Sequence, residues 1–284
     1  MFLLARDIEL LNRFNMDELR KLQLIELDVL KYVDSFCRRN DIHYSLYGGT
    51  LLGAIRHKGF IPWDDDLDIC MLRSEYERFL ALWAKEKHEG YIIQNKETDH
   101  DFSQSFTKVR KNNTAFVQEY DVGKDYHKGI FIDIFPFDRI PTGFQRKVYK
   151  IVAMFYLLCC REFVPPRSKS TCFQRLVTKF FFMCTSEKTR TKIRKFLFNW
   201  MRNFDTDTSL ELVSVATLLA LSIIYPANIA NRLVEVDFEG LKFFAWENWN
   251  SALSLLYGDY WVLPPEDERN WPHRPLLLDF ENNA

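Results

Sequence analysis

Residues 47–69 read YGGTLLGAIRHKGFIPWDDDLDI and constrain the fold more strongly than any other stretch of the chain. A double glycine, Gly48-Gly49, interrupts an extended apolar segment and is followed by an acidic run. The acidic run contains four aspartates, Asp64, Asp65, Asp66 and Asp68. Leu67 and Ile69 flank Asp68. A carboxylate among apolar residues is unfavourable unless a partner neutralises it. The chain must therefore fold so that these aspartates share a partner.

Helical and strand patterns alternate through the first half of the chain, which is typical of an α+β fold. Apolar residues at helical spacing predict a helix over 16–39, with Asn15 and Glu18 as its N-terminal capping box. GIFIDIF, residues 129–135, is the strongest strand pattern, and Pro136 is expected to close it. We predict further strands over 42–47, 67–71, 91–94, 106–110 and 115–118, and helices over 50–57 and 74–87.

Three regions follow from these patterns. Residues 1–143 should form a small mixed sheet with flanking helices that carries the site, because the strand patterns lie there. Residues 144–230 are predicted to be a helical, basic region, and 231–284 should pack back on the core. The apolar stretches 151–160 and 212–224 are shorter than the ~20 residues of a membrane-spanning helix, so we interpret both as buried helices.

The spacing of the aspartates predicts a metal site. Residues two apart in a strand project from the same face, so Asp66 and Asp68 should point the same way, with Leu67 and Ile69 facing the core. Two adjacent carboxylates repel each other unless a cation lies between them. Oxygen-only ligands favour Mg²⁺, with Mn²⁺ as an alternative. Handling of phosphate with help from a metal is the chemistry that this arrangement indicates.

A third carboxylate is expected from the strongest strand. Asp133 is the one charged residue of GIFIDIF, and burial without a partner would be unfavourable. It could complete the metal site and could also take the proton from an attacking hydroxyl. Asp138 follows Pro136 in what we expect to be a loop, and is a weaker candidate.

Groups that could bind phosphate lie at three places. Gly48, Gly49 and Thr50 stand where a strand turns into a helix, and backbone N–H groups at a helix N-terminus favour an anion. Arg56, His57 and Lys58 could contact phosphate, or form a solvated basic turn. Two further candidates, Lys108 and Arg110, alternate on one strand face. His273 and Arg274, near the C-terminus, could cover the site, although a surface loop is the favoured interpretation.

The helical region is strongly basic. Residues 161–202 contain eleven basic and two acidic residues, with phenylalanines interleaved, although the whole chain has a formal net charge of −1. Such a stretch is typical of contact with an anionic membrane surface, and equally of a solvated helix face over a phenylalanine core. Nucleic acid is not an expected partner, because no recognised nucleic-acid motif accompanies the charge.

Cysteine spacing and the N-terminal sequence bear on the compartment. The six cysteines form no C-x-x-C pair, so we interpret them as reduced core thiols. The N-terminal sequence has no basic segment before a long apolar run, so a cleaved signal peptide is not expected. These features favour a cytoplasmic protein, with the inner face of the membrane as a possible place of peripheral contact.

The motifs resemble the LicD family. The resemblance is carried by residues 47–69, by GIFIDIFPFD, and by the later FEG and YGDYWVLPP. This family includes bacterial phosphocholine transferases and fukutin-related proteins, and belongs to the nucleotidyltransferase superfamily related to polymerase β. The resemblance implies a polymerase-β-like core followed by the helical region. It also implies that Gly48 and Gly49 form the glycine turn, and that Asp66, Asp68 and Asp133 are catalytic metal ligands.

The resemblance further implies a reaction. The family donor is CDP-choline or a related CDP-alcohol. A sugar hydroxyl of a cell-surface glycan (lipopolysaccharide, teichoic acid or capsule) would attack the phosphorus bearing choline, and CMP would leave. Alternatives remain: a nucleotidyltransferase that uses an NTP, transfer of another CDP-activated alcohol phosphate, a D-x-D glycosyltransferase, or a catalytically silent protein that binds a nucleotide or glycan. If choline is transferred, aromatic rings must cage it. Candidates are Trp246, Trp249, Tyr257, Tyr260, Trp261 and Trp271.

Overall fold

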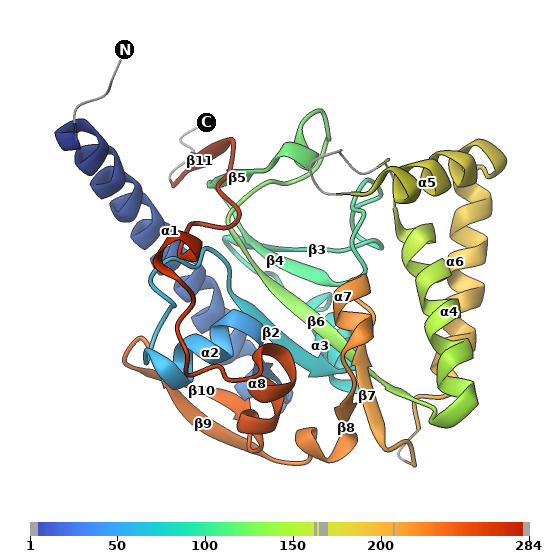
Figure 1. The fold of residues 1–284 in the computed structure, drawn as a ribbon. Coiled ribbons are helices and arrows are strands. Elements are labelled where there is room, and N and C mark those ends of the chain that lie inside the picture. The colour runs from blue at the N-terminus through green and yellow to red at the C-terminus, as the bar shows by residue number, and fades with distance from the viewer. Residues whose placement is uncertain (1–4, 162–163, 165–169, 207, 281–284) are drawn as a thin grey trace.

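A computed structural model describes residues 5–161, 164, 170–206 and 208–280 of the chain. A mixed sheet lies at its centre, with helices on its faces and a layer of helices at one side (Figure 1). The sheet order is β1-β2-β6-β4-β3, with β7 beside the second half of β6 and β8 beside β7. These strands are β1 Ser45–Leu46, β2 Asp68–Leu72, β3 Tyr91–Gln94, β4 Thr107–Lys111, β6 Phe131–Ile140, β7 Glu211–Ser214 and β8 Tyr225–Pro226. The α+β prediction is confirmed.

Two small antiparallel pairs accompany the central sheet, namely β9 with β10 and β5 with β11. β11 lies near the C-terminus, after the last helix in the sequence. Its pairing with β5 therefore attaches the C-terminal part of the chain to the core. Their bounds are β5 Ala115–Val117, β9 Leu233–Phe238, β10 Leu241–Trp246 and β11 Leu277–Asp279.

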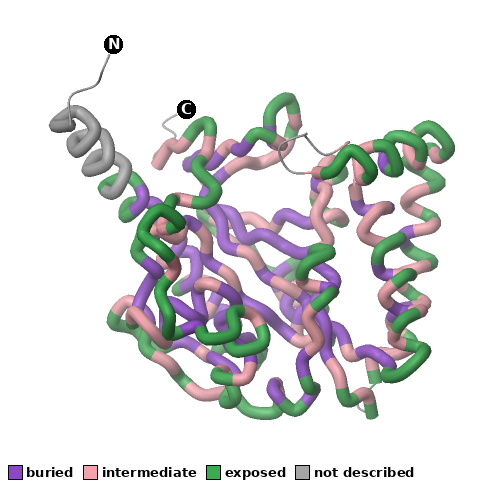
Figure 2. The backbone as a smooth tube through the Cα atoms, viewed as in Figure 1, coloured by how far each residue is buried: buried purple, intermediate pink, exposed green. Residues whose placement is uncertain are grey.

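Eight α-helices are described. α1 crosses the sheet and buries Val29, Val33 and Phe36 against Ile132 and Ile134 of β6. Figure 2 shows the central strands as the most continuously buried part and α5 as mostly exposed. The helices are α1 Ala5–Arg39, α2 Gly48–Arg56, α3 Arg73–Trp83, α4 Gly143–Cys160, α5 Cys172–Cys184, α6 Glu187–Arg202, α7 Leu218–Ser222 and α8 Trp249–Tyr257. Short 3₁₀ turns cover Glu119–Asp121, Ala227–Ala230 and Glu266–Glu268.

Two predicted boundaries are wrong for physical reasons. α1 begins at Ala5, so the helix runs through Asn15 and does not start there. β6 does not close at Pro136 but continues to Ile140. Its pairing with β4 ends at Ile134 and its pairing with β7 begins at Phe137. Pro136 therefore lies between the two neighbours, where its missing N–H disturbs neither ladder.

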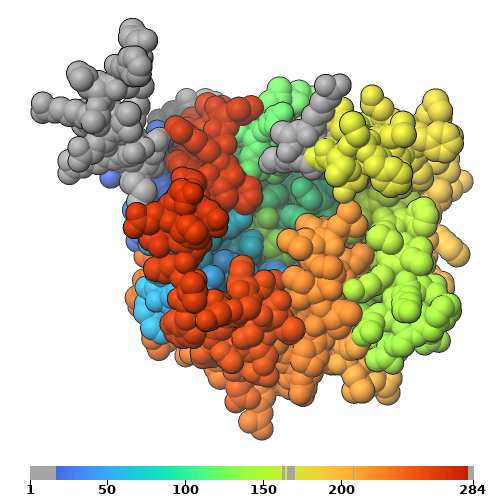
Figure 3. Space-filling view, in the orientation of Figure 1, coloured from blue at the N-terminus to red at the C-terminus, as the bar shows by residue number. Residues whose placement is uncertain are grey.

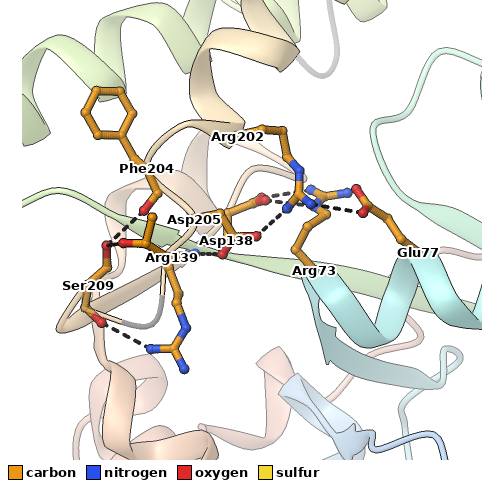
Figure 4. A network of polar contacts seen from close by, with 9 residues as sticks. Arg73, Glu77, Asp138, Arg139, Arg202, Phe204, Asp205 and Ser209 are labelled. Carbon is orange, nitrogen blue, oxygen red and sulfur yellow. Dashed lines mark hydrogen bonds and ion pairs between the residues drawn. The ribbon is translucent and has the colours of Figure 1, made fainter.

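Asp138 consequently lies in β6 and not in a loop. Its carboxylate accepts two hydrogen bonds from the guanidinium of Arg73, at 2.7 and 2.8 Å, and both side chains are buried. Figure 4 shows that Arg202 bridges Glu77 of α3 and Asp205, which follows α6. The ion pairs of Arg202 join the helical layer to α3, and the pair between Arg73 and Asp138 joins α3 to β6. Asp138 therefore has a structural partner in Arg73.

The helical region departs from expectation in three ways. The stretch 212–224 is not one helix, because it contains most of β7 and then the short α7. Only part of 151–160 is buried, since Ile151, Met154 and Phe155 are exposed. All six cysteines are free, but Cys172 and Cys184 are exposed and do not belong to the core. No helix among the described residues is both long and apolar enough to cross a membrane.

Candidate functional site

The site is built on the parallel pairing of β2 with β6. This register places Asp68 directly opposite Asp133, and the antiparallel β4 places Lys108 opposite Asp133 on the other side. The Nζ of Lys108 donates a hydrogen bond to Oδ1 of Asp133 at 2.6 Å. A cation of the chain thus lies beside two carboxylates on three neighbouring strands.

Lys108 is held in an apolar, aromatic setting. Its side chain is 3% exposed, and Nζ lies 3.4 Å from the centroid of the Phe131 ring. Burial lowers the pKa of Lys108, while Asp133 acts in the opposite direction. A buried ammonium needs this compensation, and it receives it from both the carboxylate and the ring face.

The glycine turn lies against the aspartates. Gly48 has φ +56°, and a Cβ placed on it would lie 3.0 Å from Oδ2 of Asp68. A Cβ on Gly49 would lie 2.5 Å from Oδ2 of Asp64. α2 begins at this turn, and Tyr47 in its N-cap position forms no side-chain cap. The start of α2, whose N-cap forms no side-chain cap, therefore lies beside the acidic cluster, where an anion carrying a cation could contact both the carboxylates and the first backbone N–H groups.

The side chain of Thr50 serves the scaffold. Its Oγ1 accepts a hydrogen bond from the backbone N–H of Asp68 at 2.8 Å, and the residue is buried. The N–H of Tyr47 also donates to the carbonyl of Asp68, at 3.0 Å. These contacts fix the start of β2 against the start of α2, so Thr50 positions Asp68.

Asp65 and Asp66 point toward the C-terminal segment. The Asp65 side chain is fully buried and accepts hydrogen bonds from Nε1 of Trp271 and, at 3.0 Å, from the N–H of His273. Nδ1 of His273 lies 3.1 Å from Oδ1 of Asp65 and 3.5 Å from Oδ2 of Asp66. His273 does lie in an exposed loop, as predicted, and its ring also lies against the acidic cluster.

The acidic cluster favours protonation in the metal-free protein. Burial, with the neighbouring carboxylates, raises the pKa of Asp64 to about 8. Burial also raises the pKa of Asp66 to about 6, although His273 opposes the shift. For Asp68, burial first and then Asp66 and Asp133 raise the pKa well above its ordinary range. A divalent cation would relieve this repulsion.

Two arrangements of the cluster could hold a cation. Asp65, Asp66 and His273 offer ligand atoms that all lie within 4.8 Å of one another. The predicted set of Asp66, Asp68 and Asp133 is not such a group among the described residues: Asp68 lies opposite Asp133, but Asp66 is turned toward His273. Carboxylate oxygens suit Mg²⁺ and Mn²⁺. Asp65 already accepts hydrogen bonds from Trp271 and His273, and the set of Asp66, Asp68 and Asp133 remains a prediction.

The other predicted basic residues lie away from the carboxylates. Arg56, His57 and Lys58 are at the far end of α2, about 12 Å along the helix axis from Gly48. Arg56 donates to His57 and to the carbonyl of Tyr260. Arg110 is buried and donates to Gln94 and to the carbonyl of Gly129. Of the basic candidates, the structure brings Lys108 to the carboxylates.

Two further residues lie beside the cluster: Tyr257, one of the candidate rings, and Glu26, which sequence reasoning missed. The hydroxyl of Tyr257, at the end of α8, lies 3.8 Å from where a Cβ on Gly48 would be. Burial, then Asp68, raises its pKa. Glu26 of α1 is 2% exposed, and its Oε2 has no hydrogen-bond partner. Burial and then Asp66 raise the pKa of Glu26. The signal for Glu26 was its place on the apolar stripe between Leu22 and Val29.

Comparison with known proteins identifies the family. The family model described as "LicD/FKTN/FKRP, nucleotidyltransferase domain" matches residues 41–178. The chain is 32% identical over 271 residues to the lipopolysaccharide cholinephosphotransferase LicD of Haemophilus influenzae, an alignment covering 90% of this chain and 95% of that protein. The chain belongs to the LicD family. The match to the family model includes the glycine turn, all four aspartates of the acidic run and Asp133.

Two further relatives are uncharacterized proteins of Rickettsia. One, from Rickettsia typhi, is 37% identical over 83 residues, which cover 29% of this chain and 26% of that protein. The other, from Rickettsia prowazekii, is 26% identical over 136 residues, 48% of this chain and 47% of that protein. Their partial overlap with this LicD-family chain adds no information about its reaction.

Alanine substitutions at two glycines should distinguish the effect of backbone strain from the effect of contact with the carboxylates. Gly48→Ala places a methyl group 3.0 Å from Asp68 in a backbone of positive φ. Gly143→Ala is the matched control, because Gly143 has φ +63° and nothing within 4 Å of the added Cβ. Both should lose about 1 kcal/mol of unfolding free energy from strain. Only Gly48→Ala should also weaken Mg²⁺ binding, measured by calorimetry. Equal Mg²⁺ binding in both variants would contradict the account.

The raised pKa values predict a pH-dependent response to Mg²⁺. The pKa values of Asp64 and Asp66, about 8 and about 6, exceed the ordinary value of 3.8 for an aspartate. Without Mg²⁺, these raised pKa values contribute to the free energy of unfolding. That contribution is complete below about pH 4 and is lost as the pH rises through about 6 and 8. Bound Mg²⁺ favours the charged forms. The rise in Tm on replacing EDTA with Mg²⁺ should therefore increase from pH 5 to pH 8, and should do so less in Asp66→Asn. A rise in Tm that is constant with pH would rule out this origin.

Proposed function

We propose that this LicD-family chain transfers phosphocholine from CDP-choline to a sugar hydroxyl of a lipopolysaccharide-like glycan and releases CMP. The observation that carries the proposal is the position of the glycine turn at the start of α2, which lies against Asp68, itself opposite Asp133 on the adjacent strand. The relative from Haemophilus influenzae is named as a lipopolysaccharide cholinephosphotransferase and aligns over 95% of its length. That name supports the choice of donor group and acceptor.

Different groups of the chain would bind the two sides of the donor's diphosphate. On one side, the backbone N–H groups that open α2 bind phosphate oxygens through hydrogen bonds. On the other side, Asp68, Asp133 and Asp66 would hold Mg²⁺, or Mn²⁺. When bound, that ion would neutralise the diphosphate and stabilise the charge that develops on CMP. Positioning and charge dominate phosphoryl transfer, so the chain needs no covalent intermediate.

Asp133 is suited to accept the proton of the attacking hydroxyl. Lys108 donates a hydrogen bond to Oδ1 of Asp133 and fixes the orientation of the carboxylate, so Oδ2 is the oxygen that would bind Mg²⁺ or take the proton. As the sugar oxygen forms its bond to the phosphorus bearing choline, the bond from that phosphorus to CMP breaks. The hydroxyl proton passes to Asp133, and CMP leaves with the bonding electron pair.

Tyr257 is positioned to contact the choline end of the donor. Its ring belongs to α8 and its hydroxyl reaches the glycine turn. Of the other candidate rings, Trp246 and Tyr260 are buried, Trp249 packs against the main core, and Trp271 is bonded to Asp65. Trp261 is 58% exposed, and Tyr257 is the candidate ring whose hydroxyl lies beside the glycine turn. An aromatic face attracts a quaternary ammonium.

We also propose that the protein lies on the cytoplasmic side of an anionic membrane and makes peripheral contact with it. The support is the basic charge of the helical region, five of whose basic residues lie in α4 and α5, which contain no acidic residue. Contact with a membrane would bring the enzyme to a lipid-linked acceptor, and CDP-choline would be available in the cytoplasm.

The reaction products test the proposal. Purified chain, CDP-choline and Mg²⁺ are incubated with lipopolysaccharide, and phosphocholine on the glycan and free CMP are quantified. Equal amounts of the two products are expected. Asp68→Asn and Asp133→Asn should each slow transfer by about a hundredfold or more, because each removes a preorganised charge at the reacting diphosphate. Asp237→Asn is the matched control, since Asp237 forms an exposed ion pair with Lys242 on β9–β10.

Other outcomes would replace this function with a defined alternative. Release of pyrophosphate from CTP or ATP, without use of CDP-choline, would indicate a nucleotidyltransferase. Preference for CDP-ethanolamine or CDP-ribitol would keep the mechanism and change the transferred group. Undiminished transfer by Asp68→Asn would refute the assignment of the site.

A further inference from the structure

The apolar side chains on one face of α5 form a stripe that is exposed and not buried. Of its thirteen residues, the helix buries only Thr178. Phe173, Leu176, Val177 and Phe180 follow the i, i+3, i+4, i+7 spacing of one helix face, and their exposed fractions are 74%, 66%, 38% and 62%. Contiguous apolar surface of this kind on a soluble domain marks a place of interaction.

α4 and α7 extend this surface. Ile151, Met154 and Phe155 of α4 are exposed at helical spacing, and Leu218 of α7 is 43% exposed. Between these helices lies an apolar groove of about 420 Å³, whose walls include Met154, Phe155, Phe173, Val177 and Leu218. We call this surface of α4, α5 and α7 the apolar face.

The charge next to the apolar face is of one sign. α4 and α5 contain no acidic residue. Lys147 and Lys179 are exposed, Arg175 is partly exposed, and Arg161 contributes to the wall of the groove. Exposed phenylalanines beside lysine and arginine are the features that hold a helix in the interface of an anionic bilayer. A second protein with an apolar patch would not by itself require the positive charge.

The apolar face adjoins a hollow in the surface over the central strands (Figure 3). Figure 3 shows a hollow between the C-terminal residues and the helical layer, with atoms of the central strands at its floor. α5 and α7 form the rim of this hollow on the side of the helical layer. Contact of α5 and α7 with a bilayer would therefore place the hollow next to the lipid surface.

We propose that the apolar face of α4, α5 and α7 docks this protein on an anionic lipid bilayer, with Phe173, Leu176 and Phe180 inserted in the interface. The role of docking rests on the proposed function, because it brings the site to a lipid-linked acceptor. Two contributions combine: burial of the exposed aromatic and aliphatic side chains, and attraction between the basic residues and anionic lipid.

Vesicle sedimentation tests the docking surface. The full chain is mixed with vesicles of phosphatidylglycerol or of phosphatidylcholine, at about 0.1 M and about 1 M salt, where the Debye length is about 10 and about 3 Å. Binding should be stronger to phosphatidylglycerol and should weaken at high salt. The double variant Phe173→Ser/Phe180→Ser should bind at least about tenfold more weakly, because burial of each ring contributes that much or more.

A matched control and two further measurements make the test decisive. Leu210→Ser removes an apolar side chain that is 73% exposed and lies outside the apolar face, so vesicle binding should not change. Lys179→Glu should weaken binding to phosphatidylglycerol and leave the Tm unchanged. Equal binding by the double variant, or no binding to phosphatidylglycerol by the unaltered chain, would overturn the proposal. So would light scattering that shows an oligomer which the double variant dissociates, because the face would then join copies of the chain.

Activity distinguishes failure of docking from failure of the proposed function. The double variant should transfer phosphocholine normally to a detergent-free, water-soluble glycan, and more slowly to a lipid-linked glycan in vesicles. Equal rates on the lipid-linked glycan would overturn docking as a route to the acceptor. Vesicle binding without any transfer by the unaltered chain would instead reject the proposed reaction and leave the docking surface in place.

Discussion

The parallel pairing of β2 with β6 places two carboxylates side by side on neighbouring strands. Asp68 and Asp133 are in register, and their repulsion is relieved on one side by the buried ammonium of Lys108. The glycine turn closes against the same carboxylates, since side chains on Gly48 or Gly49 would meet Asp68 or Asp64. The fold thus concentrates negative charge at a helix N-terminus. This arrangement is suited to a ligand that carries both anionic oxygens and a cation.

The C-terminal part of the chain completes this arrangement from outside the sheet. Asp65 differs from its neighbours because Trp271 and His273 satisfy its carboxylate. Beyond them, β11 pairs with β5. The segment is therefore attached at two points, and its position determines the side of the acidic cluster that His273 covers. Asp65 holds the segment in place, while Asp68 lies against the glycine turn and Asp133 is bonded to Lys108.

Much of the site's scaffold could be predicted from sequence, because its elements are local. The strand patterns around Asp68 and Asp133 and the glycine turn each span a few residues, and the structure contains all three. What could not be predicted depends on contacts between distant residues. Asp138 is paired with Arg73, and β6 continues through Pro136 because its partner changes there from β4 to β7. Likewise, His273 reaches Asp65 across more than two hundred residues, and periodicity could not show that the stripe of α5 faces outward.

Calorimetric titration of CDP-choline in Mg²⁺ and in EDTA tests the central claim most directly, with the unaltered chain and Asp68→Asn compared at one pH. The account predicts binding of CDP-choline that requires Mg²⁺ and is lost in Asp68→Asn, because nucleotide and cation share the space between the glycine turn and the carboxylates. Binding of equal strength in EDTA, or binding that Asp68→Asn retains, would show that the aspartates do not hold a cation for the donor.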